Sequence, residues 1–423
     1  MNLLYLVHRL PYPPDRGDRI RSWHLLRFLA EHARVDVACL ADEPVTDEQR
    51  RALAAVCRRV AIVPLDRRVR WFHAARSLAR GRSATEGLFH SRQLVRTLTD
   101  WASETRYNRV VAFCSSMAPY LDLPALSGVA KFCDLVDVDS QKWFDYAATA
   151  RGLKRRLFAL EGRRVRKLEM NLAHQTEALL VVSQPEAGLL HRFCPMANVH
   201  AIANGVDLDY FHNPKSKIQN PKSLVFVGAL DYRANIDGVT WFCRQVLPRV
   251  RARYPQAVVS LVGRNPLSAV RELASLPGVE LVGQVPDIRP FVVAATVAIA
   301  PLRVARGIQN KVLEGAALGK PVISSSAALE GFDLVPGEHV LRADTPDEWL
   351  AAISLLFDDP AERDRLAAAG QAFVEEHHTW SARLAPLADL LRLDASVGNA
   401  LCGVPELATR RAEALAVAMN PEP

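Results

Sequence analysis

The chain has 423 residues, of which 49% are hydrophobic and 23% are charged, and its formal net charge is +7. This length exceeds one ordinary hydrophobic core, so two domains are expected, and no run approaches the ~20 apolar residues of a membrane-spanning helix. The seven cysteines show no Cys-x-x-Cys spacing, which argues against a disulfide framework or a zinc site and favours the reduced, buried thiols of a cytoplasmic protein.

The first part of the chain predicts a strand, a loop, a helix and a second strand. Leu3–Val7 is expected to be a strand rather than a secretory leader, because its apolar run is short and no basic segment precedes it. A proline-rich loop leads to a helix from about Asp18 to Glu31 and a strand at Val35–Leu40. The loop carries Gly17, where the backbone could approach a ligand, although the loop is not a Gly-x-Gly-x-x-Gly fingerprint.

Acidic residues follow a later predicted strand in the segment DLVDVDSQKW. Asp134, Asp137 and Asp139 lie where a parallel strand meets the ligand crevice, so they are candidates to bind an acceptor hydroxyl or to act as a base, with Asp137 favoured. The alternative is structural, because Asp139 or Ser140 would also serve as the cap of the next helix. Strands of this region are expected at Val60–Val63, Val110–Cys114, Ala130–Val136 and Leu179–Val182.

Basic residues are concentrated in two blocks of the N-terminal half. The segment from Arg67 to Arg109 contains ten arginines and three acids. The segment from Arg151 to Glu169 contains eight lysines and arginines and two glutamates. Such blocks suit an anionic membrane surface or a phosphorylated lipid acceptor. Nucleic acid is not expected as a partner because no recognisable binding motif accompanies the charge. A solvated basic helix face is the structural alternative.

A second alternating series begins after a linker rich in Asn, Pro and Lys near residue 212. The two halves therefore predict two doubly wound, parallel-sheet α/β domains facing each other across a cleft. The strands of the second half are expected near Leu224–Val227, Val258–Val262, Val279–Val282, Val297–Ala300 and Val322–Ser324. Its helices are expected at about Asn235–Arg253, Pro266–Ala274, Asp287–Ala294, Lys311–Leu318, Pro346–Phe357 and Pro360–His378, followed by Trp380–Leu393.

The segment from Val297 to Ser325 predicts one parallel crossover whose helix begins near Lys311. A helix N-terminus offers unpaired N–H groups and partial positive charge, which suit a phosphate. Arg303, Arg306 and Lys311 add formal cations, and Glu314 is placed to accept hydrogen bonds from a ribose diol. Alternatively, Lys311 and Glu314 are only an exposed surface pair.

Several segments in this order resemble glycosyltransferase family 4, which has the two-domain GT-B fold. They include LLYLVHRLPYPPDRGDR, ANGVDLDYF, FVGAL, LVGRNP and GIQNKVLEGAALGKPVIS. The stretches DLVDVDSQKW and VGALDYRANIDGVTWF look closest to the sugar transferases associated with exosortase-type exopolysaccharide clusters. The resemblance implies retaining transfer of a sugar from a nucleoside-diphosphate donor, with no cofactor and no bound metal.

At two places the sequence differs from the family pattern, so the residues expected to contact the donor also differ. Glu314 matches the second acid of the family's spaced glutamate pair, but Arg306 stands where the first acid is expected. The family's diphosphate-binding arginine and lysine positions hold Ala229 and Ala234. We therefore expect Arg306 and Lys311 to hold the diphosphate. The predicted catalytic residues are Asp137, Asp139, Arg306 and Lys311, and the predicted donor-binding residues are Gly17, Arg233, Gly307, Gln309, Asn310 and Glu314.

The expected organisation follows from this resemblance. Residues 1–205 form an acceptor-side domain, 206–378 a donor domain, 379–395 a helix crossing back to the first domain, and 396–423 a tail. The acceptor is expected to be a lipid-linked or growing glycan, with the protein cytoplasmic or peripheral at the inner face of the cytoplasmic membrane. A nucleotide-sugar epimerase and a non-catalytic scaffold remain as alternatives, while a phosphorylase lacks its expected lysine motif.

Overall fold

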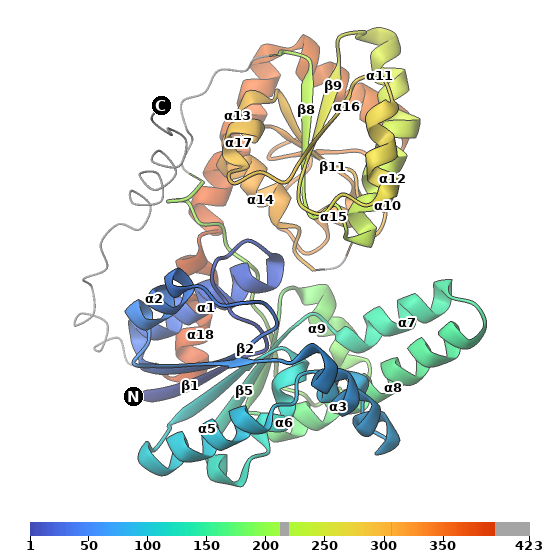
Figure 1. Ribbon diagram of the computed structural model, residues 1–423. Coiled ribbons are helices and arrows are strands. Elements are labelled where there is room, and N and C mark those ends of the chain that lie inside the picture. Colours follow the sequence, from blue (N-terminus) through green and yellow to red (C-terminus); the bar gives the residue numbers. More distant parts are fainter. Residues whose placement is uncertain (212–219, 306, 394–423) are drawn as a thin grey trace, which may run out of the picture. The chain divides into compact units, whose positions relative to one another are not determined.

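The computed structural model describes residues 1–211, 220–305 and 307–393, so Arg306 and the predicted tail 396–423 lie outside the described residues. The chain divides into two units, one of Met1–Ala203 with the residues from Leu384 onward, and one of Asn204–Arg383. Each unit is built on one parallel sheet with helices packed against it (Figure 1). The predicted fold class of two doubly wound α/β domains is confirmed.

The sheet of the first unit has seven parallel strands in the order β3-β2-β1-β4-β5-β6-β7. Side chains alternate between its faces: Leu4 and Leu6 pack into the cluster that contains Leu94 and Leu98 of α5, whereas the Tyr5 hydroxyl donates to the carbonyl of Ser22 in α1 on the opposite face. The strands are β1 (Asn2–Val7), β2 (Arg34–Ala41), β3 (Arg59–Pro64), β4 (Arg109–Phe113), β5 (Ala130–Val136), β6 (Ala178–Val181) and β7 (Val199–Ala201).

At least one helix lies between each pair of successive strands, as connections between parallel strands require. The last helix of the described chain, α18, also belongs largely to this unit, where the Leu391 carbonyl accepts a hydrogen bond from Arg109 at the start of β4. The helices are α1 (Gly17–His32), α2 (Asp47–Val56), α3 (Arg67–Ala79), α4 (Ala84–Leu88), α5 (Arg92–Glu104), α6 (Ala118–Leu121), α7 (Asp139–Thr149), α8 (Gly152–Gln175), α9 (Gln184–His191) and α18 (Trp380–Leu391).

The sheet of the second unit has six parallel strands in the order β10-β9-β8-β11-β12-β13. Its strands are nearly continuous apolar runs, as expected where both faces are covered by helices, and they share one hydrophobic cluster with the surrounding helices. The strands are β8 (Ser223–Val227), β9 (Val258–Val262), β10 (Val279–Gly283), β11 (Val297–Ala300), β12 (Val322–Ser324) and β13 (Leu341–Arg342).

The helices of the second unit differ from the prediction mainly at one place. The predicted helix Asn235–Arg253 is interrupted by a π-helical turn at Phe242–Val246, next to Pro248 at the second position of the segment that follows. The helices are α10 (Arg233–Trp241), α11 (Leu247–Arg253), α12 (Ser268–Arg271), α13 (Arg289–Ala294), α14 (Asn310–Ala317), α15 (Ser326–Leu329), α16 (Pro346–Asp358) and α17 (Pro360–His377).

Each sheet reverses its direction of winding once, and this point fixes where a ligand crevice opens. In the first unit the reversal falls between β1 and β4, and in the second unit between β8 and β11. Open α/β sheets bind ligands beyond the carboxyl ends of the strands at such a switch point. The residues that follow these four strands are therefore the first places to look for function.

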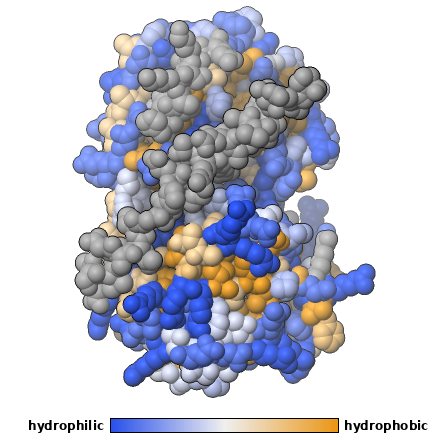
Figure 2. Space-filling view, turned by 60° about the vertical axis from the view of Figure 1, so that its left-hand side comes forward, coloured by the Kyte–Doolittle hydropathy of each residue, from blue (hydrophilic) through white to orange (hydrophobic). Residues whose placement is uncertain are grey.

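The surface carries polar residues and some hydrophobic ones. Hydrophilic residues cover most of the face shown in Figure 2, where hydrophobic residues also gather in one area of the first unit. None of the described helices combines the length and apolar character needed to cross a lipid bilayer. Trp71 and Phe72 of α3 stand out, because 62% and 66% of their surface remains exposed.

Candidate functional site

The switch point of the second unit is built around a glycine and a lysine. Gly228 follows β8, and a Cβ atom there would lie 2.8 Å from Nδ2 of Asn235 and 3.3 Å from Cε of Lys311. Only glycine allows this close approach, so the glycine of the FVGAL segment brings the Lys311 side chain against the end of β8. Lys311 itself belongs to the first turn of α14, after β11. The predicted Lys311 thus lies at the β8–β11 switch point.

The ammonium group of Lys311 is held by neutral partners. It donates to Oδ1 of Asn235 at 3.3 Å and to Oε1 of Gln309 at 3.2 Å, and it lies 5.5 Å from the centre of the Phe226 ring. Within the described residues no carboxylate lies within salt-bridge distance of it. A cation placed among amide oxygens and an aromatic face is ready to accept an anionic ligand.

Lys311 and Glu314 are both half-buried, so the alternative of an exposed surface pair is wrong. The two side chains line a cavity of about 10 Å³ whose other walls include Val225 and Val227. Burial lowers the pKa of Lys311 to about 8, although the nearby Glu314 opposes this change. Burial also raises the pKa of Glu314 to about 7, against the effect of Lys311. Both groups therefore titrate near neutrality.

The first turn of α14 is not capped by the side chain before it. The helix begins at Asn310, one residue earlier than predicted, and its N-cap residue Gln309 makes no side-chain capping bond. Oδ1 of Asn310 accepts a hydrogen bond from Asn204 at 3.1 Å, which fixes the amide at the helix start. Gly307 has φ 61°, a left-handed conformation that favours glycine. The predicted Gly307, Gln309, Asn310, Lys311 and Glu314 thus belong to one continuous loop-and-helix segment.

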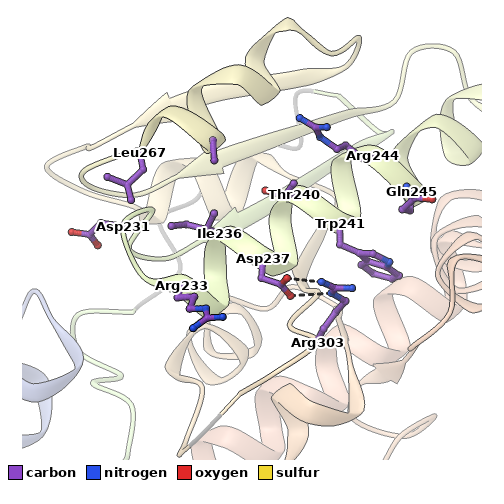
Figure 3. A pocket seen from close by; sticks show the side chains of 11 residues that line it. Asp231, Arg233, Ile236, Asp237, Thr240, Trp241, Arg244, Gln245, Leu267 and Arg303 are labelled. Carbon is purple, nitrogen blue, oxygen red and sulfur yellow. Dashed lines mark hydrogen bonds and ion pairs between the residues drawn. The ribbon is translucent and has the colours of Figure 1, made fainter. Parts of the chain in front are cut away.

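Arg233 lines a different cavity from the one that contains Lys311. It is exposed at the start of α10, and it borders a cavity of about 650 Å³ together with Trp241 and Arg244 (Figure 3). Arg303, expected beside the start of α14, instead donates from Nε to Asp237 of α10 at 2.9 Å. Of the predicted cations in the described part of this unit, Arg233 and Arg303 therefore lie at the 650 Å³ cavity. Lys311 lies at the switch point.

The switch point of the first unit combines a histidine with an aspartate. His8 follows β1, with its Nε2 3.5 Å from Oδ2 of Asp18, and its buried Nδ1 has no hydrogen-bond partner. Burial alone would raise the pKa of Asp18, but hydrogen bonding to His8 and the charge of Arg9 outweigh it and hold this pKa well below its ordinary value. The predicted Gly17 begins α1 here, and a Cβ atom on it would meet nothing within 4 Å. Its backbone therefore borders open space.

Asp139 does not cap the helix that it begins, so the structural alternative for Asp139 and Ser140 is wrong. The N-cap of α7 is Val138, and no side chain of the cap bonds to the helix. Oδ2 of Asp139 instead accepts a hydrogen bond from Ser115 at 2.9 Å. Burial raises the pKa of Asp139, although Lys142 and the Ser115 hydrogen bond oppose this.

Two glutamates that are distant in the sequence accept hydrogen bonds from backbone N–H groups at the start of α7. Glu186 accepts from the backbone N–H of Val138 at 2.7 Å, and Glu169 accepts from that of Ser140 at 3.0 Å. Burial raises the pKa of Glu169 to about 8. These partners lie 48 and 29 residues away in the sequence, so local capping rules could not have identified them.

The side chain of Asp137 has a buried oxygen that no hydrogen-bond donor in the described part of the chain satisfies. Its Oδ1 is buried and has no hydrogen-bond partner. Burial, followed by repulsion from Glu186 and Asp139, raises the pKa of Asp137 to about 7. A carboxyl group with this pKa exchanges a proton near neutral pH, which is the property of a general acid or base. Asp137 and Asp139 are thus both at the carboxyl end of β5, as predicted.

The backbone before Asp137 is strained. Val136 has φ 68°, an unfavourable conformation for a β-branched residue, and the pairing of β5 with β6 shifts by one residue between Asp134 and Val136. Oδ1 of Asp134 accepts from the Val136 N–H at 3.0 Å, while its Oδ2 accepts from Nε of Arg21 at 2.8 Å. Asp134 is thereby neutralised and structural, in contrast to Asp137.

Sequence reasoning missed several of these participants. His8 is not among the predicted site residues, and neither are Asn235, Ser115 and Glu186, whose side chains support predicted residues. Position directly after a strand next to the winding reversal is the signal that would have found His8 and Ser115. Across the described residues, no group of three or more His, Cys, Asp or Glu side chains is arranged to hold a metal ion.

Comparisons with known proteins add the family context. Residues 221–359 match the family model described as "Glycosyl transferases group 1". A comparison with curated proteins gave no match. The sucrose-phosphate synthase of Thermosynechococcus elongatus has 18% identity and a TM-score of 0.68, over 93% of this chain and 98% of that one.

Two further solved structures have the same fold. HepE of Anabaena, in a complex with UDP-glucose, has 15% identity and a TM-score of 0.63, over 93% of this chain and 99% of that one. WaaG, a glycosyltransferase involved in lipopolysaccharide biosynthesis, has 12% identity and a TM-score of 0.60, over 92% and 99%. The chain therefore has the GT-B fold, and residues 221–359 of its second unit are similar to the group 1 glycosyltransferase model.

Proposed function

We propose that this chain is a retaining glycosyltransferase of the family 4 type that moves a sugar from a nucleoside-diphosphate donor to an acceptor. One observation carries the proposal: the Lys311 ammonium lies at the β8–β11 switch point, beside the start of α14, with only neutral hydrogen-bond partners. A pyrophosphate would supply the anion that this cation lacks.

The donor would be held by one short segment. Lys311 and backbone N–H groups at the start of α14 bind the diphosphate, with Gly307, Gln309 and Asn310 shaping the approach. Glu314, one turn further, accepts hydrogen bonds from the ribose diol when it is ionised. Arg306 and Arg233 remain predicted contributors to the diphosphate site.

The chemical step would depend on charge placed before the reaction begins. As the sugar leaves, the diphosphate gains negative charge, and a cation already aimed at it lowers the barrier. A single preorganised donor of this kind typically contributes about 3–4 kcal/mol to transition-state stabilisation. No cofactor is required for this step, and the sugar acceptor would be bound by the first unit.

In the first unit, Asp137 and Asp139 would contact the acceptor. Asp137 has an unpaired, buried oxygen and a pKa raised to about 7 by burial and by neighbouring acids. It is thus suited to accept a hydrogen bond or a proton from the attacking hydroxyl group. Gly17 leaves the backbone of the first unit open at the β1–β4 switch point.

The biological setting is a narrower part of the proposal. Sequence resemblance to exosortase-associated sugar transferases points to exopolysaccharide assembly, with a lipid-linked or growing glycan as the acceptor. The basic blocks at 67–109 and 151–169 suit a position at the inner face of the cytoplasmic membrane.

A screen of nucleotide sugars by thermal unfolding tests the central claim. UDP-glucose heads the panel because the Anabaena structure contains it, and UDP, GDP, ADP and dTDP sugars follow. A ligand present at 100 times its Kd stabilises the folded protein by about 2.7 kcal/mol. We expect one nucleotide class to raise the Tm of the wild type but not that of Glu314→Ala. The absence of stabilisation by every nucleotide would sink the proposal.

A further inference from the structure

Helix α3 turns its large hydrophobic side chains toward solvent. Its buried side consists of small residues such as Ala74 and Ser77, which are 3% and 8% exposed and lie on the side of α4. Trp71 and Phe72 are on the other side, 62% and 66% exposed, with Val69 at 49%. Aromatic side chains of this size normally bury most of their surface. An outward group of them on one helix therefore marks an interaction surface.

The beginning of α8 extends this surface. Leu153 and Leu157 are 71% and 54% exposed and four residues apart, so they lie on one face of the helix. The same spacing continues to Glu161, whose carboxylate accepts from the backbone N–H groups of Ala84 and Thr85 at 2.9 and 3.0 Å. Further along α8, this side of the helix thus contacts the start of α4 through Glu161.

A second contact fixes the two helices together. Nη1 of Arg164 in α8 donates to the carbonyl of Arg82, directly after α3, at 3.1 Å. These contacts join α8 to the segment that follows α3, and the exposed hydrophobic residues of both helices belong to the first unit. We call this the α3–α8 surface, and it consists of Arg68, Val69, Trp71, Phe72, Arg76, Leu78, Leu153, Lys154, Arg155, Arg156 and Leu157.

Basic residues outnumber acids around these side chains, although Asp66 caps the start of α3. Residues 67–85 contain six arginines and residues 151–160 contain four lysines and arginines, and neither segment contains an acid. Every residue from 151 to 157 is exposed. Basic residues close to an anionic bilayer strengthen binding by about 1 kcal/mol each, which is roughly a five-fold change in affinity.

We propose that the α3–α8 surface docks onto the face of an anionic lipid bilayer. Trp71, Phe72 and the leucines of α8 enter the boundary between headgroups and acyl chains, where aromatic rings are favoured, and the arginines meet the lipid phosphates. This partner deepens the proposed function, because a lipid-linked acceptor is delivered at such a surface. The exposed fractions of these side chains show that they project into solvent, as insertion into lipid requires.

Vesicle flotation of the full chain tests the proposal. One set of vesicles contains phosphatidylcholine alone and the other contains about 30% phosphatidylglycerol, enough anionic lipid to create a negative surface potential. We expect the wild type to float with the anionic vesicles only. The double variant Trp71→Ser/Phe72→Ser should lose at least about ten-fold in partitioning, and Arg68→Gln/Arg76→Gln should lose roughly ten-fold or more.

A matched control removes the same number of exposed hydrophobic side chains elsewhere. Met196→Ser/Leu355→Ser changes residues that are 93% and 40% exposed, and its flotation should equal that of the wild type. Equal flotation of Trp71→Ser/Phe72→Ser and the wild type, or no flotation of the wild type, overturns the proposal. Self-association of the wild type that this variant abolishes would also overturn it, because the surface would then bind a second copy.

Thermal stabilisation by nucleotide and vesicle flotation test the glycosyltransferase proposal and the docking surface separately. Stabilisation by nucleotide should be unchanged in Trp71→Ser/Phe72→Ser, since these residues belong to the first unit and α14 belongs to the second. If no nucleotide stabilises the wild type but flotation depends on Trp71 and Phe72, the glycosyltransferase proposal fails and the docking surface stands. Nucleotide binding without flotation overturns the docking surface and leaves the glycosyltransferase proposal standing.

Discussion

The switch points of the two units have the same topology and opposite chemistry. In the second unit the carboxyl ends of β8 and β11 surround one ammonium group, Lys311, whose partners are amide oxygens. In the first unit the carboxyl ends of β1, β4 and β5 surround carboxyl groups, among them Asp137 and Asp139. The strand order creates a switch point in both units, and the residues directly after the strands decide which charge lies there.

The first unit also shows what distinguishes a structural acid from an available one. Asp134 is fully buried and paired with Arg21, whose Nη1 also donates to the Ile202 carbonyl at 2.8 Å. Asp137, three residues later, keeps an oxygen without a partner. A buried acid that is paired with a cation stabilises the fold. A buried acid with an oxygen that lacks a hydrogen-bond partner remains available to interact with a ligand.

The largest effect is expected from breaking the neutralised pair. Arg21→Met leaves the Asp134 carboxylate buried without its cation, so the free energy of unfolding should fall by about 3–5 kcal/mol. Urea unfolding measures this change. A loss below about 1 kcal/mol would show that Asp134 is neutralised by other means and would weaken the contrast with Asp137.

Removal of the cation at the other switch point should affect function and spare stability. Lys311→Ala should lower the turnover number about 10²–10³-fold, equivalent to about 3–4 kcal/mol of transition-state stabilisation. The fold should survive, because none of the carboxylates in the described part of the chain forms an ion pair with Lys311. Arg244→Ala, which changes an exposed cation of the same unit, is the matched control and should retain turnover. Near-normal turnover of Lys311→Ala would remove Lys311 from the donor site.

Asp137→Asn separates the two kinds of acid within the first unit. Because the pKa of Asp137 is raised in the folded protein, folding favours the protonated form, and stability falls as pH rises from about 4 to above 7. The asparagine variant lacks this loss and should be more stable at pH 8 by roughly 1–4 kcal/mol, since a pKa difference of one corresponds to about 1.4 kcal/mol. Urea unfolding at pH 5 and pH 8 checks it, and transfer should fall in the same variant.

The pH dependence of nucleotide binding should distinguish the second unit from the first. Affinity should rise with pH up to about 7 as Glu314 ionises and accepts from the ribose, and fall above about 8 as Lys311 loses its proton. Outside this window a ten-fold change per pH unit is the limit for one group. Titration calorimetry of the wild type and Glu314→Gln measures it. The acid limb should vanish in the variant, and its persistence would assign that limb to another group.

The smallest effect is expected at the exposed ion pair of the 650 Å³ cavity. Asp237 and Arg303 are 37% and 52% exposed, so the pair gains little from Coulomb attraction in water. Arg303→Met should change the free energy of unfolding by about 0–1 kcal/mol, measured beside Arg21→Met. A cost as large as that of Arg21→Met would mean that exposure does not separate the two pairs.

Local pattern was enough to predict most of the fold. Apolar runs located the strands of both sheets to within a residue or two, because a buried parallel strand is apolar along its whole length. The short strands β7 and β13 were not predicted, because strands of three and two residues are too short to show a periodic pattern. The π-helical turn at Phe242–Val246 escaped as well, because helical periodicity does not report a single widened turn.

The candidate site was only partly predictable, for a different reason. Lys311 and Glu314 were found because the helix start after a strand has a local signature. Their perturbed pKa values depend on apolar walls from β8 and β11, which only the folded chain brings together. The partners of the first unit, such as Glu186 for Val138, join residues far apart in the chain, and no spacing rule anticipates them.

The shifted pairing at the end of β5 has a consequence for how other sequences should be read. A strand that counts one residue more than its neighbour reverses the side on which the next side chain emerges. A related chain that lacks one residue between Asp134 and Val136 would turn a different acid toward the crevice, even if every letter around it were the same. Insertions and deletions at this point therefore matter more than substitutions, and an alignment should be checked there for a gap before any aspartate is equated with Asp137.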